Sequence, residues 1–97
     1  MIIELKKFGT TLTSRQMGKE SLAAYAPVLN EARENEIIEI DFSGVNTFSP
    51  SWGDEFLTYL YNKYGDRLKL VNTKNPSVQA TINILEQTNK MKFNVLS

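Results

Sequence analysis

Residues 36–56 read Glu36-Ile-Ile-Glu-Ile-Asp-Phe-Ser-Gly-Val-Asn-Thr-Phe-Ser-Pro-Ser-Trp-Gly-Asp-Glu-Phe56, and this stretch decides the fold. Residues 36–42 are rich in β-branched side chains between polar boundaries, which predicts a strand in the middle of a sheet. Residues 43–50 contain glycine, asparagine and a Ser-Pro pair, so they predict a loop. A helix is expected over 50–64, because large apolar side chains recur there every four residues. The stretch therefore predicts a strand, a loop and a helix in succession, as in an α/β fold.

The residues before this stretch predict strands and a further helix. Apolar and charged residues alternate over 2–7, which predicts a half-buried strand, and 10–12 is expected to form a short return strand. Thr13 and Gln16 form a Thr-x-x-Gln pattern that indicates a capping box at the start of a helix. One apolar stripe follows at helical spacing, made of Gly18, Leu22, Tyr25, Leu29 and Ala32.

The limits of this helix and the elements near the C-terminus follow from local signals. Pro27 removes a backbone hydrogen bond, so we expect a kink or two abutting short helices, with a stop near Asn35. Segments 67–71 and 91–96 predict two more strands. Asn75-Pro76 is typical of the cap and first position of a third helix. The buried face of that helix is expected to carry Val78, Ile82 and Leu85.

The order of the predicted elements defines the fold class. Strands that alternate with helices imply right-handed crossovers and a largely parallel sheet. A length of 97 residues fits one domain. We therefore expect an α/β fold, in a single small domain over residues 1–97, with a mostly parallel sheet of four or five strands and three main helices.

The composition excludes several classes of function. The chain has no Cys and no His, which rules out a disulfide, a Cys-based zinc site and Ser-His-Asp or Cys-His catalysis within it. Its 11 Lys and Arg balance 11 Asp and Glu, whereas a nucleic-acid-binding protein usually has a basic face. No apolar run approaches the roughly 20 residues that span a bilayer. We therefore expect a cytoplasmic protein that binds neither nucleic acid nor a membrane and uses no cofactor or metal.

Catalysis by carboxylates alone is not expected either. The candidate acids are Asp41, Asp54, Glu55 and Asp66. Asp54 and Glu55 are adjacent, but neighbouring helix residues point about 100° apart and so do not converge on one atom. The chain also lacks the glycine-rich loops that hold nucleotide phosphates. The sequence thus favours a binding role over an enzymatic one.

The loop and helix start after the central strand form the candidate site. Loops at the carboxyl ends of parallel strands are where α/β folds place ligands and partners. Ser49 and Pro50 suit the cap and first position of the helix. A phosphate on Ser49 or Ser51 would meet free backbone N–H groups there, although Asp54 and Glu55 would oppose it. The alternative for Ser49 is a capping role and nothing more.

This segment resembles the STAS-like family, which is related to anti-sigma-factor antagonists. The resemblance rests on Asp41-Phe-Ser-Gly-Val45 followed by Ser49-Pro-Ser-Trp-Gly-Asp-Glu-Phe56. Upstream, Phe8-Gly-Thr-Thr-Leu-Thr-Ser-Arg15 is similar to the family's entry into its first helix, and Asn75-Pro-Ser-Val78 is similar to the start of its third. The resemblance covers nearly the whole chain and implies a STAS-like fold.

The resemblance also implies a regulatory function. In the antagonists, a Ser at the helix start is phosphorylated by a partner kinase, which switches binding off. Here Ser49 falls on the family's Asp, Pro50 on the usual phosphoacceptor and Ser51 on the neighbouring Ser. Proline cannot accept phosphate, so Ser51 or Ser49 is the candidate acceptor, or docking is constitutive. The implied partner is an anti-sigma-type kinase or a histidine-kinase-like protein with an ATP-binding domain.

The expected partner-binding residues follow from this interpretation. They are Ser43, Gly44, Asn46, Thr47, Ser49, Pro50, Ser51, Trp52, Asp54 and Glu55, with Ser14 and Arg15 as auxiliary residues if the first helix starts at the same end of the sheet. Trp52 is either a core residue, which its spacing to Phe56 favours, or an exposed anchor for a partner. At least one of the tyrosines Tyr59, Tyr61 and Tyr64 is expected to be exposed, because they point in different directions around a helix.

Two other functions stay open at this point. The helix start at Pro50 is a candidate site for a small ligand, such as a nucleotide or another anion, which would make the chain a sensor. Alternatively, an edge strand over 2–7 would pair with a second copy to form a weak homodimer.

Overall fold

Four parallel strands form the main sheet of the computed structural model, which describes residues 1–97. Their order across the sheet is β1 (Ile2–Glu4), β3 (Ile38–Asp41), β5 (Leu68–Val71) and β6 (Asn94–Val95). The predicted central strand is β3, which pairs in parallel with β1 on one side and with β5 on the other. The predictions of an α/β fold and of a mostly parallel sheet are therefore confirmed.

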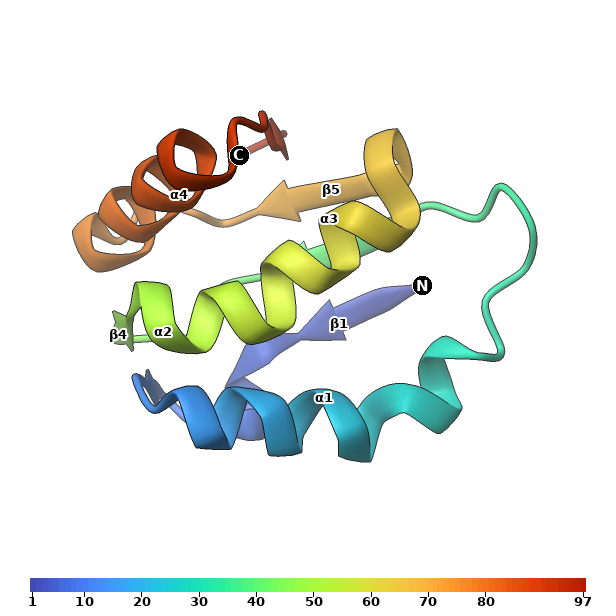
Figure 1. Ribbon diagram of the computed structural model, residues 1–97, viewed down its shortest axis with the longest axis horizontal. Coiled ribbons are helices and arrows are strands. Elements are labelled where there is room, and N and C mark those ends of the chain that lie inside the picture. The colour runs from blue at the N-terminus through green and yellow to red at the C-terminus, as the bar shows by residue number, and fades with distance from the viewer.

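Three helices lie along the sheet (Figure 1). The first is α1 (Arg15–Leu29), and the third is α4 (Pro76–Asn89). The second is continuous and consists of α2 (Pro50–Gly53), a π-helical turn η2 (Asp54–Thr58) and α3 (Tyr59–Tyr64). The short 3-10 helices η1 (Leu5–Phe8) and η3 (Gly65–Arg67) precede β2 and β5. None of these helices combines the length and the hydropathy needed to cross a bilayer.

One face of the sheet is buried under the helices (Figure 1). Along β3 and β5 the side chains alternate between fully buried and partly exposed positions, as expected when only one face of a sheet contributes to the core. The buried positions are Ile38, Ile40, Leu68 and Leu70, and the partly exposed positions are Glu39, Asp41, Lys69 and Val71. The outer face is thus largely polar, although parallel sheets are usually covered on both faces.

Aromatic side chains fill the core between the helices and the sheet. Trp52 stacks on Phe56 with 4.8 Å between ring centroids, and Phe48 meets the Trp52 ring edge-on at 6.0 Å. From the N-terminal side, Phe8 packs against Phe56 at 5.2 Å. The apolar faces predicted for the second and third helices are confirmed: Trp52, Phe56, Leu57, Leu60, Tyr64, Val78, Ile82 and Leu85 are all buried. Tyr59 is the exposed tyrosine that the helical spacing predicts.

The second helix differs from the sequence prediction in one respect. The spacing by four over 50–64 predicts a regular α-helix, whereas Asp54–Thr58 forms a wider π-helical turn. A π turn adds a residue to the helix without interrupting its axis, and such turns are often found at functional sites. The hydroxyl of Thr58, at the end of this turn, is buried and has no hydrogen-bond partner.

The first predicted strand is shorter in the structure, and the return strand pairs elsewhere. β1 ends at Glu4 because its neighbour β3 ends at the paired residue Asp41, so the backbone beyond Glu4 has no strand to pair with and forms η1. The predicted return strand is β2 (Thr11–Leu12). It pairs in parallel with β4 (Thr47–Phe48), inside the predicted 43–50 loop, and not with β1. β1 lies at the edge of the main sheet, the position that the homodimer alternative requires.

The start and end of α1 also differ from the prediction. Its cap is Ser14, whose hydroxyl accepts a hydrogen bond from the Met17 N–H at 3.2 Å, so the capping box at Thr13 is wrong. Pro27 lies inside one continuous helix that ends at Leu29, and the expectation of two short helices is wrong. Near a helix end, proline disrupts few further hydrogen bonds. Asn35, the predicted stop, lies beyond the helix in a left-handed conformation with φ 68°.

Gly18 sets the distance between α1 and α2. A Cβ at this position would lie 2.9 Å from the Trp52 carbonyl oxygen and 3.2 Å from Glu55 Cβ. Both neighbours are held by the second helix and cannot move independently of it, so only glycine allows this close approach.

We expect Gly18→Ala to lower the free energy of unfolding by about 1–3 kcal/mol, the usual cost of overpacking. At an exposed helical position, Gly→Ala would raise the free energy of unfolding by roughly 0.5–1 kcal/mol. The sign of the change therefore shows whether Gly18 is in close contact with the second helix. Urea denaturation measures it, with Lys19→Ala at the next, exposed position as the matched control. A Gly18→Ala protein as stable as the wild type would contradict the close approach.

Candidate functional site

The predicted loop and the starts of two helices meet at one end of the sheet. Residues 43–49 leave β3 at its carboxyl end, and α1 and α2 both begin there, near β4 (Figure 1). The sequence leaves open whether the start of α1 lies at this end. The structure places Ser14 and Arg15 beside the loop, because β2 and β4 run in parallel and lead directly into α1 and α2.

The loop is attached to the N-terminal segment through its backbone. The N–H groups of Asn46 and Thr47 both donate to the Thr10 carbonyl, at 2.8 and 3.1 Å, and the Ser49 N–H donates to the Leu12 carbonyl at 2.9 Å. These bonds leave the side chains of Asn46 and Thr47 exposed to solvent, as a contact surface requires.

The start of α4 holds the other side of the loop. The Asn75 carboxamide accepts hydrogen bonds from the N–H groups of Ser77 and Val78, which confirms its predicted role as a cap. Its Nδ2 also donates to the Asn46 carbonyl at 3.1 Å. Ser77 Oγ accepts from the Phe48 N–H at 3.0 Å and donates to the Phe48 carbonyl at 3.2 Å. The sequence predicts the cap, but it contains no local signal for these contacts across about 30 residues.

Ser49 caps α2 and also joins the two helix starts. Its hydroxyl accepts a hydrogen bond from the Trp52 N–H at 3.3 Å and donates to the Thr13 carbonyl at 2.8 Å. The Ser49 hydroxyl therefore acts both as a hydrogen-bond acceptor and as a donor. Its bond from the Trp52 N–H is the capping role that the sequence offers as the alternative to phosphorylation. Phosphorylation of Ser49 would break the bond to Thr13, because a phosphate ester has no hydroxyl proton at this oxygen.

Ser51 differs from Ser49 in its hydrogen bonds. Both side chains are partly exposed, but the Ser51 hydroxyl, at the second position of α2, takes part in none of the side-chain hydrogen bonds around the loop. Of the two candidate phosphoacceptors, Ser51 is the one whose hydroxyl can be modified without loss of an existing hydrogen bond.

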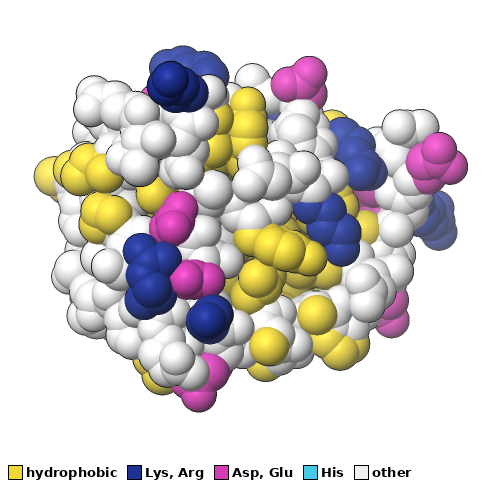
Figure 2. Space-filling view, in the orientation of Figure 1, with side chains coloured by type: hydrophobic (Ala, Val, Ile, Leu, Met, Phe, Trp, Pro, Cys, Tyr) yellow, Lys and Arg dark blue, Asp and Glu magenta, His cyan; other side chains and the backbone are white.

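Arg15 bridges the two acidic residues that follow Ser51. Its Nη1 lies 3.2 Å from Asp54 Oδ2 and 2.9 Å from Glu55 Oε1. The hydrogen bond to Glu55, followed by that to Asp54, raises the pKa of Arg15 above its ordinary value. Figure 2 shows the basic and acidic side chains next to one another over the starts of α1 and α2. We name Ser51, Arg15, Asp54 and Glu55 the Arg15 cluster.

Trp52 does not belong to the exposed part of this site. Its side chain is 1% exposed, so the interpretation of Trp52 as an exposed anchor for a partner is wrong, and its core alternative is the one observed. The other predicted contact residues of the loop are accessible: Ser43 and Gly44 are exposed, and Pro50 is partly exposed. Gly44 adopts φ 83°, which favours glycine, next to the aliphatic part of Lys6.

Asp41 and Asn72 stabilise the turn at the start of the loop. Asp41 Oδ1 accepts hydrogen bonds from Asn72 Nδ2 and from the Ser43 N–H, both at 2.9 Å. The bond from Asn72 is the main reason that the pKa of Asp41 lies below its ordinary value. Asn72 has φ 58°, a conformation that Asn adopts more readily than most residues. No pattern in the sequence indicates this role for Asn72.

Neither of the two cavities in the structure reaches this surface. One lies between the ends of α1 and α3, and the other between α4 and β6, and no residue of 43–56 lines either of them. No group of three or more Asp and Glu side chains is arranged to hold a metal ion. The site at this end of the sheet is therefore a surface and not a pocket.

We expect Asn72→Gly to raise the pKa of Asp41 toward its ordinary value, since glycine keeps the left-handed backbone and removes the donor. A lowered pKa stabilises the fold above the pKa of the unfolded chain, and that stability is lost as the pH falls through the folded-state pKa. The variant should therefore lose less stability on acidification than the wild type. Carboxyl ¹³C NMR titration and acid unfolding measure both effects, with Asn62→Ala as the control. An unchanged Asp41 pKa in Asn72→Gly would contradict the assigned cause.

Comparison with known proteins agrees with the sequence resemblance. The sequence matches a family described as a STAS-like domain of unknown function over residues 25–78. This match spans β3, the loop, α2, α3, β5 and the start of α4. It therefore includes the loop and the acidic residues of the site but not Ser14 and Arg15 at the start of α1. No curated protein and no solved structure matches the chain. Because the match covers more than half of the residues, the chain belongs to the family of STAS-like domains of unknown function.

Proposed function

We propose that this STAS-like domain is a non-enzymatic regulatory module that binds a protein partner through its docking surface. We define the docking surface as the exposed side chains of residues 43–51 together with the Arg15 cluster. The proposed partner is an anti-sigma-type or histidine-kinase-like regulator with an ATP-binding domain, and the module acts in the cytoplasm. Family membership and the position of the surface at the carboxyl ends of the strands support this proposal.

The observation that carries the proposal is the Arg15 cluster. Asp54 and Glu55 follow Ser51 by three and four residues, and such residues lie on the same side of a helix. Arg15 reaches this side from another helix and binds both carboxylates. The free hydroxyl of Ser51 is therefore on the same side of the helix as two anions that share one cation, on an accessible surface.

Phosphorylation of Ser51 would change this arrangement directly. A phosphate dianion repels nearby carboxylates and forms strong hydrogen bonds with guanidinium groups. It would therefore compete with Asp54 and Glu55 for Arg15 and would add negative charge to the docking surface. In this proposal Ser51 takes the place of the family's usual phosphoacceptor, where this chain has Pro50.

The alternative of a small-ligand sensor at Pro50 has less support. A sensor needs a concave site that surrounds much of its ligand, and neither cavity includes Pro50 or its neighbours. Hydrogen bonds from the backbone on one side and from the Asn75 side chain on the other also attach the loop, so the surface suits a partner of complementary shape better than a ligand that must be enclosed.

The test compares capture of partners by the wild type, Ser51→Ala and Ser51→Asp in lysate from the source organism, with and without ATP. We expect the wild type and Ser51→Ala to retain an ATP-binding regulator of the proposed class. Ser51→Asp should retain at least about tenfold less, which corresponds to roughly 1.4 kcal/mol of binding free energy. With ATP, mass spectrometry of the bait should find phosphate on Ser51 of the wild type.

Thr88→Asp is the matched control, because it adds one negative charge, as Ser51→Asp does, at an exposed position near the end of α4 and away from the docking surface. Its capture should equal that of the wild type, and circular dichroism should show that all variants are folded. Equal capture by Ser51→Asp and wild type, or phosphate on Ser49 and not on Ser51, would contradict the proposed switch.

A further inference from the structure

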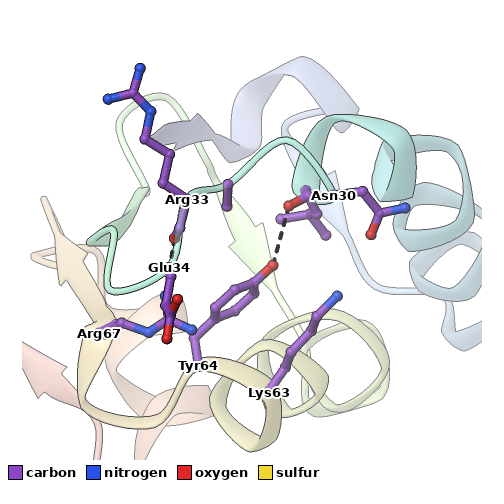
Figure 3. A pocket seen from close by; sticks show the side chains of 8 residues that line it. Asn30, Arg33, Glu34, Lys63, Tyr64 and Arg67 are labelled. Carbon is purple, nitrogen blue, oxygen red and sulfur yellow. Dashed lines mark hydrogen bonds between the residues drawn. The ribbon is translucent and has the colours of Figure 1, made fainter.

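A polar cavity lies at the end of the molecule opposite the docking surface. It is formed where α1 and α3 end, next to the amino ends of the strands, and its volume is about 250 Å³. Figure 3 shows the Tyr64 ring between Lys63 and Arg67, with Asn30 across the cavity. We name it the amino-end pocket; it is lined by Leu29, Asn30, Ala32, Arg33, Glu34, Lys63, Tyr64 and Arg67.

The amino-end pocket has an excess of positive charge. Arg33, Lys63 and Arg67 line it together with a single acidic residue, Glu34. None of the three cations takes part in the ion pairs of the structure, which involve Met1, Arg15 and Lys92. By contrast, the second cavity is lined by uncharged residues only. Of the two cavities, the amino-end pocket is therefore the one lined by cations that have no carboxylate partner.

The aromatic ring of Tyr64 holds two of these cations in place. The Lys63 ammonium lies 5.5 Å from the ring centroid, and the Arg67 guanidinium carbon lies 5.1 Å from it. Both distances allow a cation–π interaction. The ring itself is buried, and its hydroxyl donates to the Leu29 carbonyl at 3.4 Å. Lys63 and Arg67 are therefore both held at the pocket by contact with the same buried ring.

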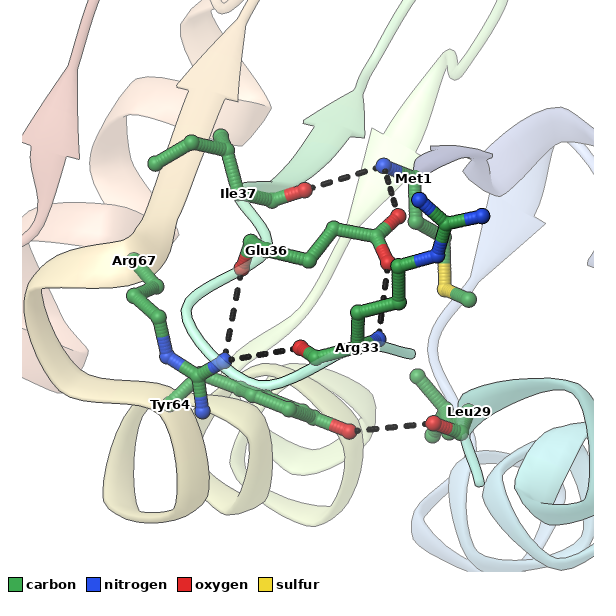
Figure 4. A network of polar contacts seen from close by, with 7 residues as sticks. All are labelled: Met1, Leu29, Arg33, Glu36, Ile37, Tyr64 and Arg67. Carbon is green, nitrogen blue, oxygen red and sulfur yellow. Dashed lines mark hydrogen bonds and ion pairs between the residues drawn. The ribbon is translucent and has the colours of Figure 1, made fainter. Parts of the chain in front are cut away.

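The neighbouring polar network does not neutralise Arg67. Its Nη1 donates to the carbonyls of Arg33 and Glu36, at 3.4 and 3.5 Å. The Glu36 carboxylate instead binds the amino group of Met1 and the Arg33 N–H, each at 2.8 Å (Figure 4). A guanidinium has five N–H donors, so the remaining donors of Arg67 are free for a ligand. In Figure 3 the Arg33 side chain points away from the pocket.

We propose that the amino-end pocket binds a small phosphate dianion beside Tyr64, where Lys63 and Arg67 line the cavity, either as free phosphate or as the head of a small phosphate monoester. Two cations match the charge of a dianion, and a guanidinium fork matches the geometry of phosphate oxygens. The volume of about 250 Å³ lies below the roughly 300–1,000 Å³ of sites for larger ligands. The pocket therefore accommodates a phosphate group and a few further atoms.

The experiment is a titration of the ¹⁵N-labelled chain, followed by amide chemical shifts at constant ionic strength. The probes are inorganic phosphate, glycerol 3-phosphate and acetate. We expect saturable shifts of residues 29–36 and 63–67 with phosphate, and none with acetate. Tighter binding of glycerol 3-phosphate would identify a monoester head as the ligand, and tighter binding of inorganic phosphate would identify the free ion.

Two single substitutions with opposite effects give a further test. Lys63→Gln removes a cation and should weaken binding about tenfold, whereas Glu34→Gln removes the opposing carboxylate and should tighten it. Lys19→Gln, on the exposed side of α1, changes the net charge as Lys63→Gln does and should leave the affinity unchanged. Shifts that do not saturate, or equal losses in Lys63→Gln and Lys19→Gln, would overturn the proposal. Capture of a partner by the docking surface does not depend on this result.

Discussion

The close approach of α1 and α2 at Gly18 is the constraint on which the docking surface depends. The absence of a side chain lets the Gly18 backbone lie against the Trp52 carbonyl and Glu55. Arg15 is one turn before Gly18, so the same approach brings its guanidinium to Asp54 and Glu55. With a larger residue at this point the helices would separate and Arg15 would lose one or both carboxylates. The close approach at Gly18 therefore determines both the packing between the two helices and the position of Arg15 beside its two carboxylates.

The two ends of the sheet carry different chemistry because different segments close them. At the carboxyl ends, the loop is attached by backbone hydrogen bonds to Thr10 and Leu12 and by Asn75. The polar groups there are largely paired, and the free groups are on the outside. At the amino ends, the chain that follows α1 and α3 leaves a hollow with unpaired cations around Tyr64. A flat surface suits a protein partner, whereas a charged hollow suits a small anion.

Local signals were enough to predict much of the fold. The β-branched run at 36–42 gives the central strand, and the Asn75-Pro76 pair gives the cap of α4. Predictions failed where the outcome depends on distant residues. The end of β1 depends on where β3 ends, and the pairing of β2 depends on β4, which is about 35 residues away. The choice of Ser14 over Thr13 as the cap of α1 is a difference of one residue that the pattern does not resolve.

The candidate site was predictable in position but not in detail. The strand–loop–helix segment indicates where the surface lies, but the role of Arg15 depends on the parallel direction of β2, which the sequence leaves open. The same holds for Ser49 and Ser51: the spacing suggests both as acceptors, and only the bond from Ser49 to Thr13 distinguishes them.

The central claim is that Ser51 and Arg15 form a phosphate-sensitive pair. Side-chain ¹⁵N NMR of Arg15, in protein with phosphoserine incorporated at position 51, tests it most directly. The account predicts a changed Arg15 signal and slower exchange of its guanidinium protons, as Arg15 binds the phosphate. An Arg15 signal identical to that of the unmodified protein would contradict it.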